Sequence, residues 1–392
     1  MLSVLRRARK SLGLLTVTVF ALALAACSAP TGPRTGGPLI DTGAAVPVAL
    51  LVPGGSGQAS DELLARSLQN AARLAIADLG NVKIDLRVYN TAGSPAQAQA
   101  MALQAVEDGA LIILGPVFAQ EANAAGVALS SRGINVLSFS NNSDIAGGNV
   151  FVLGPTFDNT ARRLGAFAVK NGEGRIMIVH DQNTAGQLGR SAIERGVTAA
   201  GGQIVAVGSY EFSQNGVVSA APGIVAQARS SSADAVFLTA DTAGALPLIT
   251  QLLADNGLSP EATRYIGLTR WDIPAATLAL PGVQGGWFAL PDPALYQQFQ
   301  ARYLAAYGEP PHPIAGLAYD GIAAIGALVK QGQSGALTAE ALTQGAGFVG
   351  VNGIFRLRSD GTNERGLAVA QVREKQVVVV DPAPRSFGGA GF

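Results

Sequence analysis

The feature that most constrains the fold of this chain is the stretch from Gly109 to Asn142, which holds two short, mainly apolar runs separated by a helical pattern. The runs lie at 111–114 and 135–139 and have the length and composition of buried parallel strands. Between them, a Gly115-Pro116 turn leads into an alanine-rich segment with helical periodicity. The order strand, turn, helix, strand predicts one β-α-β unit.

The residues that follow these two runs are candidates for one wall of a ligand cleft. In sheets built from β-α-β units, small ligands bind outside the carboxyl ends of the strands. The candidates are Pro116, Val117 and Phe118 after the first run, and Ser138, Phe139, Ser140, Asn141 and Asn142 at the end of the second. The serine and asparagine side chains have a second interpretation as ordinary turn residues that bond to the nearby backbone.

The same alternation of strands and helices extends over most of the chain. A first series has strands at 47–52 and 83–89 and helices at 60–79 and 95–107 before the central unit. A second series has strands at 175–180, 203–210, 235–239 and 265–268, with helices at 158–170, 224–230 and 241–256 and one that ends near 200. This pattern predicts an α/β fold of two lobes, each a parallel-core sheet flanked by helices.

The carboxyl-terminal part is expected to cross between the lobes several times and form a hinge. A run at 285–291 is interpreted as a strand that returns to the first lobe, followed by helices at 294–307 and 314–330. Further strands are expected at 354–357, 367–373 and 376–380. The predicted boundaries are 47–155 with 287–345 for lobe 1, and 156–286 with 346–381 for lobe 2.

Residues 1–26 have the features of a secretory signal, with basic residues before an apolar segment too short for a comfortable membrane span. The segment ends in Leu24-Ala25-Ala26-Cys27, which resembles the bacterial lipobox. That resemblance implies acylation of Cys27, and Ser28 after it favours the outer membrane. The alternative is a buried cysteine after an ordinary signal. Residues 27–46 are rich in Pro, Gly and Thr and are interpreted as a flexible tether.

Composition argues against several classes of function. Lys+Arg 27 balances Asp+Glu 27, so no general attraction to nucleic acid is implied. The chain has one cysteine and two histidines, so we expect neither a disulfide within the chain nor a metal site. The sequence indicates no cofactor. The chain has no nucleophile elbow, so we expect a protein that is not an enzyme.

The glycine-rich turn at 53–57 lacks the Gly-Lys-Ser/Thr ending of a phosphate loop. Backbone N–H groups at Gly55 and Ser56 are instead expected to line the cleft at a helix N-terminus. Further polar candidates at strand ends are Asp181, Asp241 and Thr242. Asp241 has an alternative role as a helix cap. Trp271 is a candidate shelf for a sugar or an amino acid.

The order and spacing of these segments resemble the type 1 periplasmic ligand-binding fold. The motifs that carry the resemblance are VALLVPGGSG, YNTAG, ILGPVF, GINVLSFSNN, VHDQN, FLTADTAGALPLITQLLADNG and GLAYDGIAAIGAL, between Pro47 and Asp381. The resemblance implies that Tyr319 and Asp320, at the start of the last long helix, lie on the cleft side.

Two subfamilies compete. Penicillin-binding-protein activator lipoproteins are more similar in the GPVF and GVALSSRGINVLSFSNN segments, which implies a peptidoglycan synthase as partner. The alternative is the branched-chain amino-acid receptor of an ABC importer, which implies a permease partner and a small polar ligand. Ala119 and Ala185 stand where those receptors carry a serine and an aromatic residue. The leading hypothesis is therefore a lipid-anchored periplasmic activator, with the solute receptor second and a cell-wall hydrolase third.

Overall fold

The computed structural model describes residues 37–388. The signal segment, Cys27 and residues 27–36 of the tether lie outside the described residues, so their predictions are not tested. Within 37–388, no helix combines the length and the apolar character that crossing a membrane would require. The strands of this part form sheets of five, seven and three strands.

The five-stranded sheet is entirely parallel, in the order β2-β1-β3-β4-β5. Its strands are β1 (Val46–Val52), β2 (Ile84–Asn90), β3 (Ile112–Leu114), β4 (Val136–Ser138) and β5 (Val150–Val152). The connecting helices are α2 (Ala59–Asp78), α3 (Pro95–Glu107) and α4 (Ala119–Leu129). The predicted β-α-β unit is therefore confirmed, with α4 between β3 and β4.

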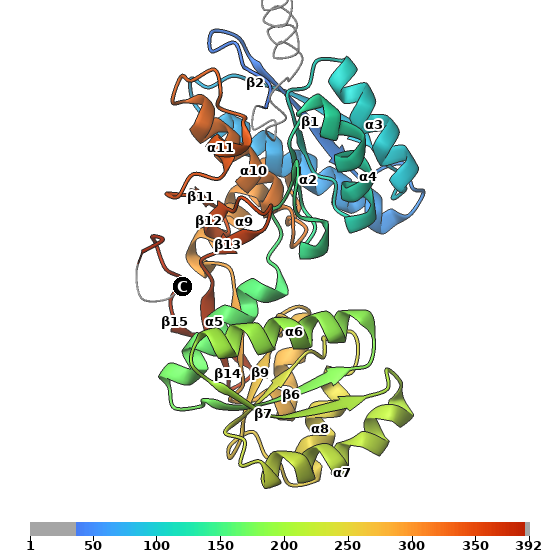
Figure 1. Cartoon of the computed structure of the whole chain (residues 1–392), viewed down its shortest axis with the longest axis vertical. Helices are drawn as coiled ribbons and strands as arrows, with labels where there is room; N and C mark the ends of the chain where they lie inside the picture. Colours follow the sequence, from blue (N-terminus) through green and yellow to red (C-terminus); the bar gives the residue numbers. More distant parts are fainter. Residues whose placement is uncertain (1–36, 389–392) are drawn as a thin grey trace, which may run out of the picture. The chain divides into compact units, whose positions relative to one another are not determined.

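Alternate residues of β1 enter two different cores, because successive side chains of a strand point to opposite faces. Val48 and Leu50 belong to a core that includes residues of α2 and α10 (Gly316–Val329), whereas Ala49 and Leu51 belong to a core with α3 and α4. Figure 1 shows α3 and α4 on one side of β1 and α2 on the other. Both faces of this sheet are covered, as the sequence predicts.

The seven-stranded sheet has the order β15-β14-β10-β9-β8-β6-β7. Its strands from β6 to β10 are parallel, and β14 and β15 are antiparallel. The bounds are β6 (Arg175–Asp181), β7 (Gln203–Tyr210), β8 (Ala235–Leu238), β9 (Arg264–Gly267), β10 (Trp287–Leu290), β14 (Ala368–Arg373) and β15 (Gln376–Asp381). Helices α5 (Phe157–Lys170) and α6 (Thr184–Ala199) pack on one face, and α7 (Gln214–Ser230) and α8 (Leu246–Asp255) on the other. The chain thus has an α/β fold with parallel-core sheets flanked by helices.

The sequence assigned two segments to the wrong sheet or core. Strand β10 was expected to return to the first lobe, but it pairs with β9 and β14 in the seven-stranded sheet. Strands β11 (Phe348–Gly350) and β12 (Gly353–Leu357) were expected in the second lobe, yet Phe348 and Phe355 pack in the core of β1 and α10. A short apolar run indicates that a strand is buried, but it does not indicate which sheet the strand joins. Apart from these segments, the division into lobes stays a prediction.

Several element boundaries also differ. Helix α7 begins at Gln214 rather than at 224, because Ser213 caps it and the helix tolerates Pro222 in its interior. Helix α8 begins at Leu246 rather than at 241. Strand β13 (Asn363–Arg365) was not predicted, since its charged residues do not resemble a buried strand. The remaining helices are α9 (Pro293–Tyr307) and the short α11 (Ala339–Leu342).

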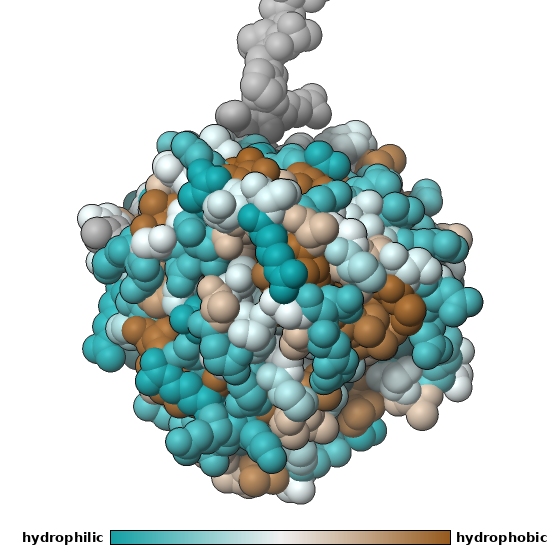
Figure 2. Space-filling model, turned by 90° about the horizontal axis from the view of Figure 1, so that it is seen from below, coloured by the Kyte–Doolittle hydropathy of each residue, from teal (hydrophilic) through white to brown (hydrophobic). Residues whose placement is uncertain are grey.

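The face shown in Figure 2 carries apolar residues in several separate patches among hydrophilic ones. Isolated apolar residues are normal on the surfaces of folded proteins and require no partner.

Candidate functional site

The polar run at the end of β4 bonds mainly to its own backbone. The Ser138 hydroxyl donates to the Pro116 carbonyl oxygen at 3.1 Å, and the Ser140 amide donates to Ser138 Oγ at 3.1 Å. The Asn142 amide donates to Ser140 Oγ at 3.1 Å, and Asn142 Oδ1 caps the next turn by accepting from Asp144 N. Ser138 and Phe139 are buried. The turn interpretation accounts for this run, and the Ser138 hydroxyl and the Phe139 ring do not face a ligand.

The turn between β3 and α4 is fixed by close packing. Gly115 has φ +88°, and a Cβ there would collide with the Leu51 carbonyl oxygen, so this position requires glycine. Pro116 is buried and Val117 packs against the first core. Only Phe118 of the predicted residues in this turn is well exposed, at 41%. It precedes the first residue of α4 and offers an aromatic surface at the strand end.

The backbone amide of Gly55 is already occupied. It donates to Glu62 Oε1 at 2.6 Å, and Ser56 Oγ accepts from the Gln58 amide at 3.1 Å. The prediction that Gly55 presents a free N–H group to a ligand is therefore wrong. Glu62, in the first turn of α2, performs the role that the sequence assigned to a ligand.

At the carboxyl ends of β6 and β8, the predicted polar residues are held by local bonds. Asp181 is buried and accepts from the Thr239 hydroxyl at 2.7 Å. Asp241 is exposed, and its Oδ1 accepts from the Gly244 amide. The Thr242 hydroxyl donates to the Ile273 carbonyl oxygen at 2.7 Å. The alternative that Asp241 caps the helix is wrong, because α8 begins at Leu246 and has no side-chain cap; Asp241 instead closes a turn that precedes α8.

Three other candidates do not present their side chains to a ligand. Trp271 is fully buried, with its ring 6.2 Å from that of Phe288, so it cannot act as a shelf. Tyr319 donates its hydroxyl to Asp78, which also pairs with Arg302, in a separate crevice. Asp320 is completely buried and forms an ion pair with Arg365 at 3.2 Å. The resemblance placed the last two on the cleft side. Tyr319 instead faces the separate crevice, and Asp320 lies buried behind Arg365.

A cavity of about 250 Å³ lies where residues that follow strands of both large sheets meet. Asn141 follows β4, Leu268 and Arg270 follow β9, and Pro291 follows β10. The cavity therefore lies at carboxyl ends of parallel strands, where ligands of such folds bind. Most of its lining is apolar. Of the four residues named here, only Asn141 was predicted from the sequence as a ligand-site candidate. The β9 and β10 ends carried no polar motif, and β10 was assigned to the wrong sheet.

Two arginines line the cavity, and each is paired with a carboxylate. Arg270 Nε donates to Asp272 Oδ1 at 2.9 Å. Arg365 Nη1 donates to Asp320 Oδ2 at 3.2 Å, and its Nε donates to the Leu153 carbonyl oxygen at 2.7 Å. The ion pairs make the charge on this wall close to balanced.

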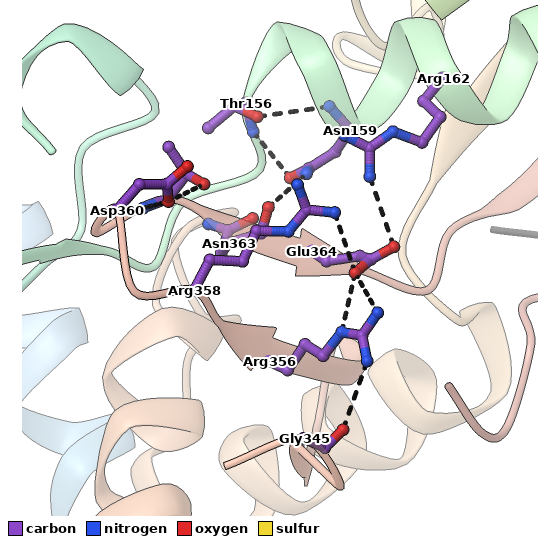
Figure 3. A network of polar contacts seen from close by, with 10 residues as sticks. Thr156, Asn159, Arg162, Gly345, Arg356, Arg358, Asp360, Asn363 and Glu364 are labelled. Atoms are coloured by element: carbon purple, nitrogen blue, oxygen red, sulfur yellow. Dashed lines mark hydrogen bonds and ion pairs between the residues drawn. The ribbon is translucent and has the colours of Figure 1, made fainter. Parts of the chain in front are cut away.

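Strand β13 anchors the wall that carries Arg365. Asn363 Nδ2 donates to the carbonyl oxygens of Val152 and Gly154, at 2.7 and 2.8 Å. Figure 3 shows the Glu364 carboxylate among guanidinium groups, and the distances are 2.6 Å to Arg356, 3.1 Å to Arg358 and 3.4 Å to Arg162. Strand β13 therefore holds the segment between β5 and α5 in place beside the cavity.

The guanidinium groups also set the ionisation of Glu364. Burial alone would raise the pKa of its carboxyl, but hydrogen bonds and charges from Arg356 and Arg358 outweigh burial and hold the pKa below its usual range. Glu364 is therefore ionised at neutral pH.

Comparison with known proteins identifies the class. Residues 45–376 match the family described as "Periplasmic binding protein", and the chain belongs to that family. A comparison with curated proteins finds no match.

The fold is similar to that of solved binding proteins. A putative branched-chain amino acid ABC transporter from Rhodospirillum rubrum matches with a TM-score of 0.72 and 19% identity, over 86% of this chain and 100% of that one. A substrate-binding protein from Desulfitobacterium hafniense in complex with Leu matches with a TM-score of 0.65 and 18% identity, over 86% and 100%. A solute-binding protein from Rhodopseudomonas palustris with 3,4-dihydroxy benzoic acid matches with a TM-score of 0.60 and 20% identity, over 88% and 97%. At such identities the likeness concerns the fold alone.

Proposed function

We propose that this chain is the solute-binding protein of an ABC importer and takes a small ligand into the cavity at the strand ends, without catalysing a reaction. The observation that carries the proposal is the position of that cavity, at carboxyl ends of strands from both large sheets, in a member of the periplasmic binding protein family. The solved proteins of similar fold include binding proteins of ABC transporters, one with Leu and one with an aromatic acid. The implied partner is an importer permease.

The sequence ranked activation of a penicillin-binding protein first and solute binding second. The comparisons favour the second function, since the structures of similar fold are described as transporter components. None of the polar clusters described for residues 37–388 has a feature that identifies it as a surface for binding a synthase. Activation therefore becomes an outcome that the experiment below must separate from solute binding.

Location in the periplasm follows from membership of the family, and lipid anchoring is a further part of the proposal. It rests on the lipobox-like Leu24-Ala25-Ala26-Cys27. Acyl chains on one cysteine would hold the chain at a membrane by burying many CH₂ groups. The intact mass of the protein purified from membranes tests this point, because acylation at Cys27 adds the mass of the lipid, and Cys27→Ala should release the chain.

Thermal unfolding of the processed chain with a panel of small solutes tests the proposed function. A ligand that binds only the folded state stabilises it by about 2.7 kcal/mol at 100 times its Kd. We expect at least one solute to raise the Tm in proportion to the logarithm of its concentration. A chain that responds to no solute but co-purifies with a penicillin-binding protein would support activation instead. Release of peptidoglycan fragments by the pure protein would indicate a hydrolase.

A further inference from the structure

If the cavity binds a solute, as proposed, the chemistry of its wall determines the class of that solute. Six aliphatic side chains contribute to the lining: Leu268, Ile273, Leu290, Ile314, Leu317 and Leu367. An engineered cavity of about 150 Å³ lined by such residues admits benzene. The present cavity, of about 250 Å³, therefore has room for a substituted ring or a branched chain.

The charged groups of the wall are already neutralised. Arg365 and Asp320 form a pair whose side chains are 2% and 0% exposed. Arg270 and Asp272 form a second pair, with side chains 27% and 15% exposed. A ligand carboxylate or ammonium would enter an apolar space whose fixed charges have partners. Burying a charge without a partner is unfavourable, because its hydration is lost and not replaced.

The polar groups that remain free on the wall are mostly uncharged. In the part of the chain that the structure describes, the Asn141 side chain and the Thr160 hydroxyl have no hydrogen-bond partner. Asn352 uses its Nδ2 to donate to Asp320 at 3.0 Å, which leaves its Oδ1 as an acceptor. Arg270 also keeps N–H groups at Nη1 that can donate to a carbonyl oxygen. These groups suit an amide, a hydroxyl or a ketone.

We infer that the solute of this cavity is an uncharged, mainly apolar molecule with one or two amide, hydroxyl or carbonyl groups. The apolar body lies against the aliphatic side chains. The polar groups of the solute bond to the free polar groups of the lining, which belong to Asn141, Thr160, Asn352 and Arg270. Because both arginines of the lining are already paired with carboxylates, the cavity disfavours zwitterionic amino acids and free carboxylic acids.

Two pairs of probes with matched bodies test the inference by calorimetry and thermal shift on the processed chain. Benzamide is compared with benzoate, and isovaleramide with L-leucine. We expect each amide to bind at least about tenfold more tightly than its charged counterpart, which corresponds to about 1.4 kcal/mol. Asn141→Ala should weaken benzamide binding about fivefold, the effect of one hydrogen bond. The control Asn215→Ala, at an exposed position of α7, should leave binding unchanged.

A second variant tests the role of the ion pairs. Asp272→Asn removes the partner of Arg270 and should raise the affinity for benzoate about tenfold, with little change for benzamide. Tighter binding of benzoate and L-leucine than of the amides by the unmodified chain would overturn the inference and leave the proposed function standing. If none of the four probes binds, the inference is overturned. A failure of the wider solute panel would then overturn the proposed function as well.

Discussion

Two buried carboxylates in different parts of the molecule have opposite surroundings. Asp320 in α10 is 0% exposed and Glu121 in α4 is 1% exposed. Asp320 accepts hydrogen bonds from the Val351 amide at 2.8 Å, from Asn352 Nδ2 at 3.0 Å and from Arg365 Nη1 at 3.2 Å. Both carboxylate oxygens of Glu121 lack a partner among the residues that the structure describes. Burial alone therefore does not determine what a charge contributes to the fold.

The ionisation of the two groups follows the same contrast. Burial raises the pKa of both carboxyls. For Asp320, the charge of Arg365 and the donors of Asn352 act against burial. For Glu121, the nearby Thr91 side chain and Phe118 backbone offset only part of the rise. Asp320 thus holds Arg365 in the cavity wall, whereas Glu121, when it is ionised, lowers the stability of the folded protein.

The largest expected effect comes from breaking the buried pair. Asp320→Asn should lower the free energy of unfolding by about 3–5 kcal/mol, because it leaves the Arg365 guanidinium buried without a counter-charge. Urea unfolding at neutral pH measures the change. A loss below about 1 kcal/mol would show that Arg365 finds another partner or water, and that the two carboxylates are less different than their contacts indicate.

Removing the unpaired charge should have the opposite sign. Glu121→Gln should raise the free energy of unfolding by about 1 kcal/mol at pH 7, since a neutral amide is less costly to bury than a carboxylate without a counter-charge. Glu107→Gln, at an exposed position near the end of α3, is the matched control and should change little. Destabilisation by Glu121→Gln would mean that the carboxylate does have a stabilising role at the N-terminus of α4.

The gain from Glu121→Gln should depend on pH. Because the folded protein holds the Glu121 pKa above its unfolded value of about 4.3, the native residue contributes its full stability only below that value and loses it as pH rises through the folded pKa. The difference between the variant and the native chain should therefore be small near pH 4 and largest at neutral pH. Parallel urea titrations of both proteins from pH 4 to pH 8 check this, and a constant difference would refute it.

An exposed ion pair provides the smallest effect. Arg195 Nη2 lies 2.8 Å from Asp158 Oδ1, with side chains 62% and 30% exposed. Asp158→Asn should lower the free energy of unfolding by less than about 1 kcal/mol, and the loss should shrink further at high salt. Urea unfolding at low and at high salt measures it. If Asp158→Asn destabilised the protein as much as Asp320→Asn does, burial would not determine how much an ion pair contributes to stability.

The sequence predicted more of the fold than of the site. The runs at 111–114 and 135–139 and the helix between them became β3, β4 and α4, because hydrophobic periodicity is a local property. Asp241 and the serines of 138–140 were correctly placed at strand ends. Their hydrogen bonds to neighbouring backbone, however, are the same turn chemistry that such residues show in any loop.

The sequence by itself determined the α/β class and most of the strands and helices, since spacing and composition encode local structure and burial. Only the tertiary structure decided that β10 joins the seven-stranded sheet, that Trp271 is in the core, and that Asp320 meets Arg365 across 45 positions of the chain. The cavity depends on these long-range contacts. Its lining comes from segments that approach only after both large sheets have formed, so no single stretch of sequence carries its signature.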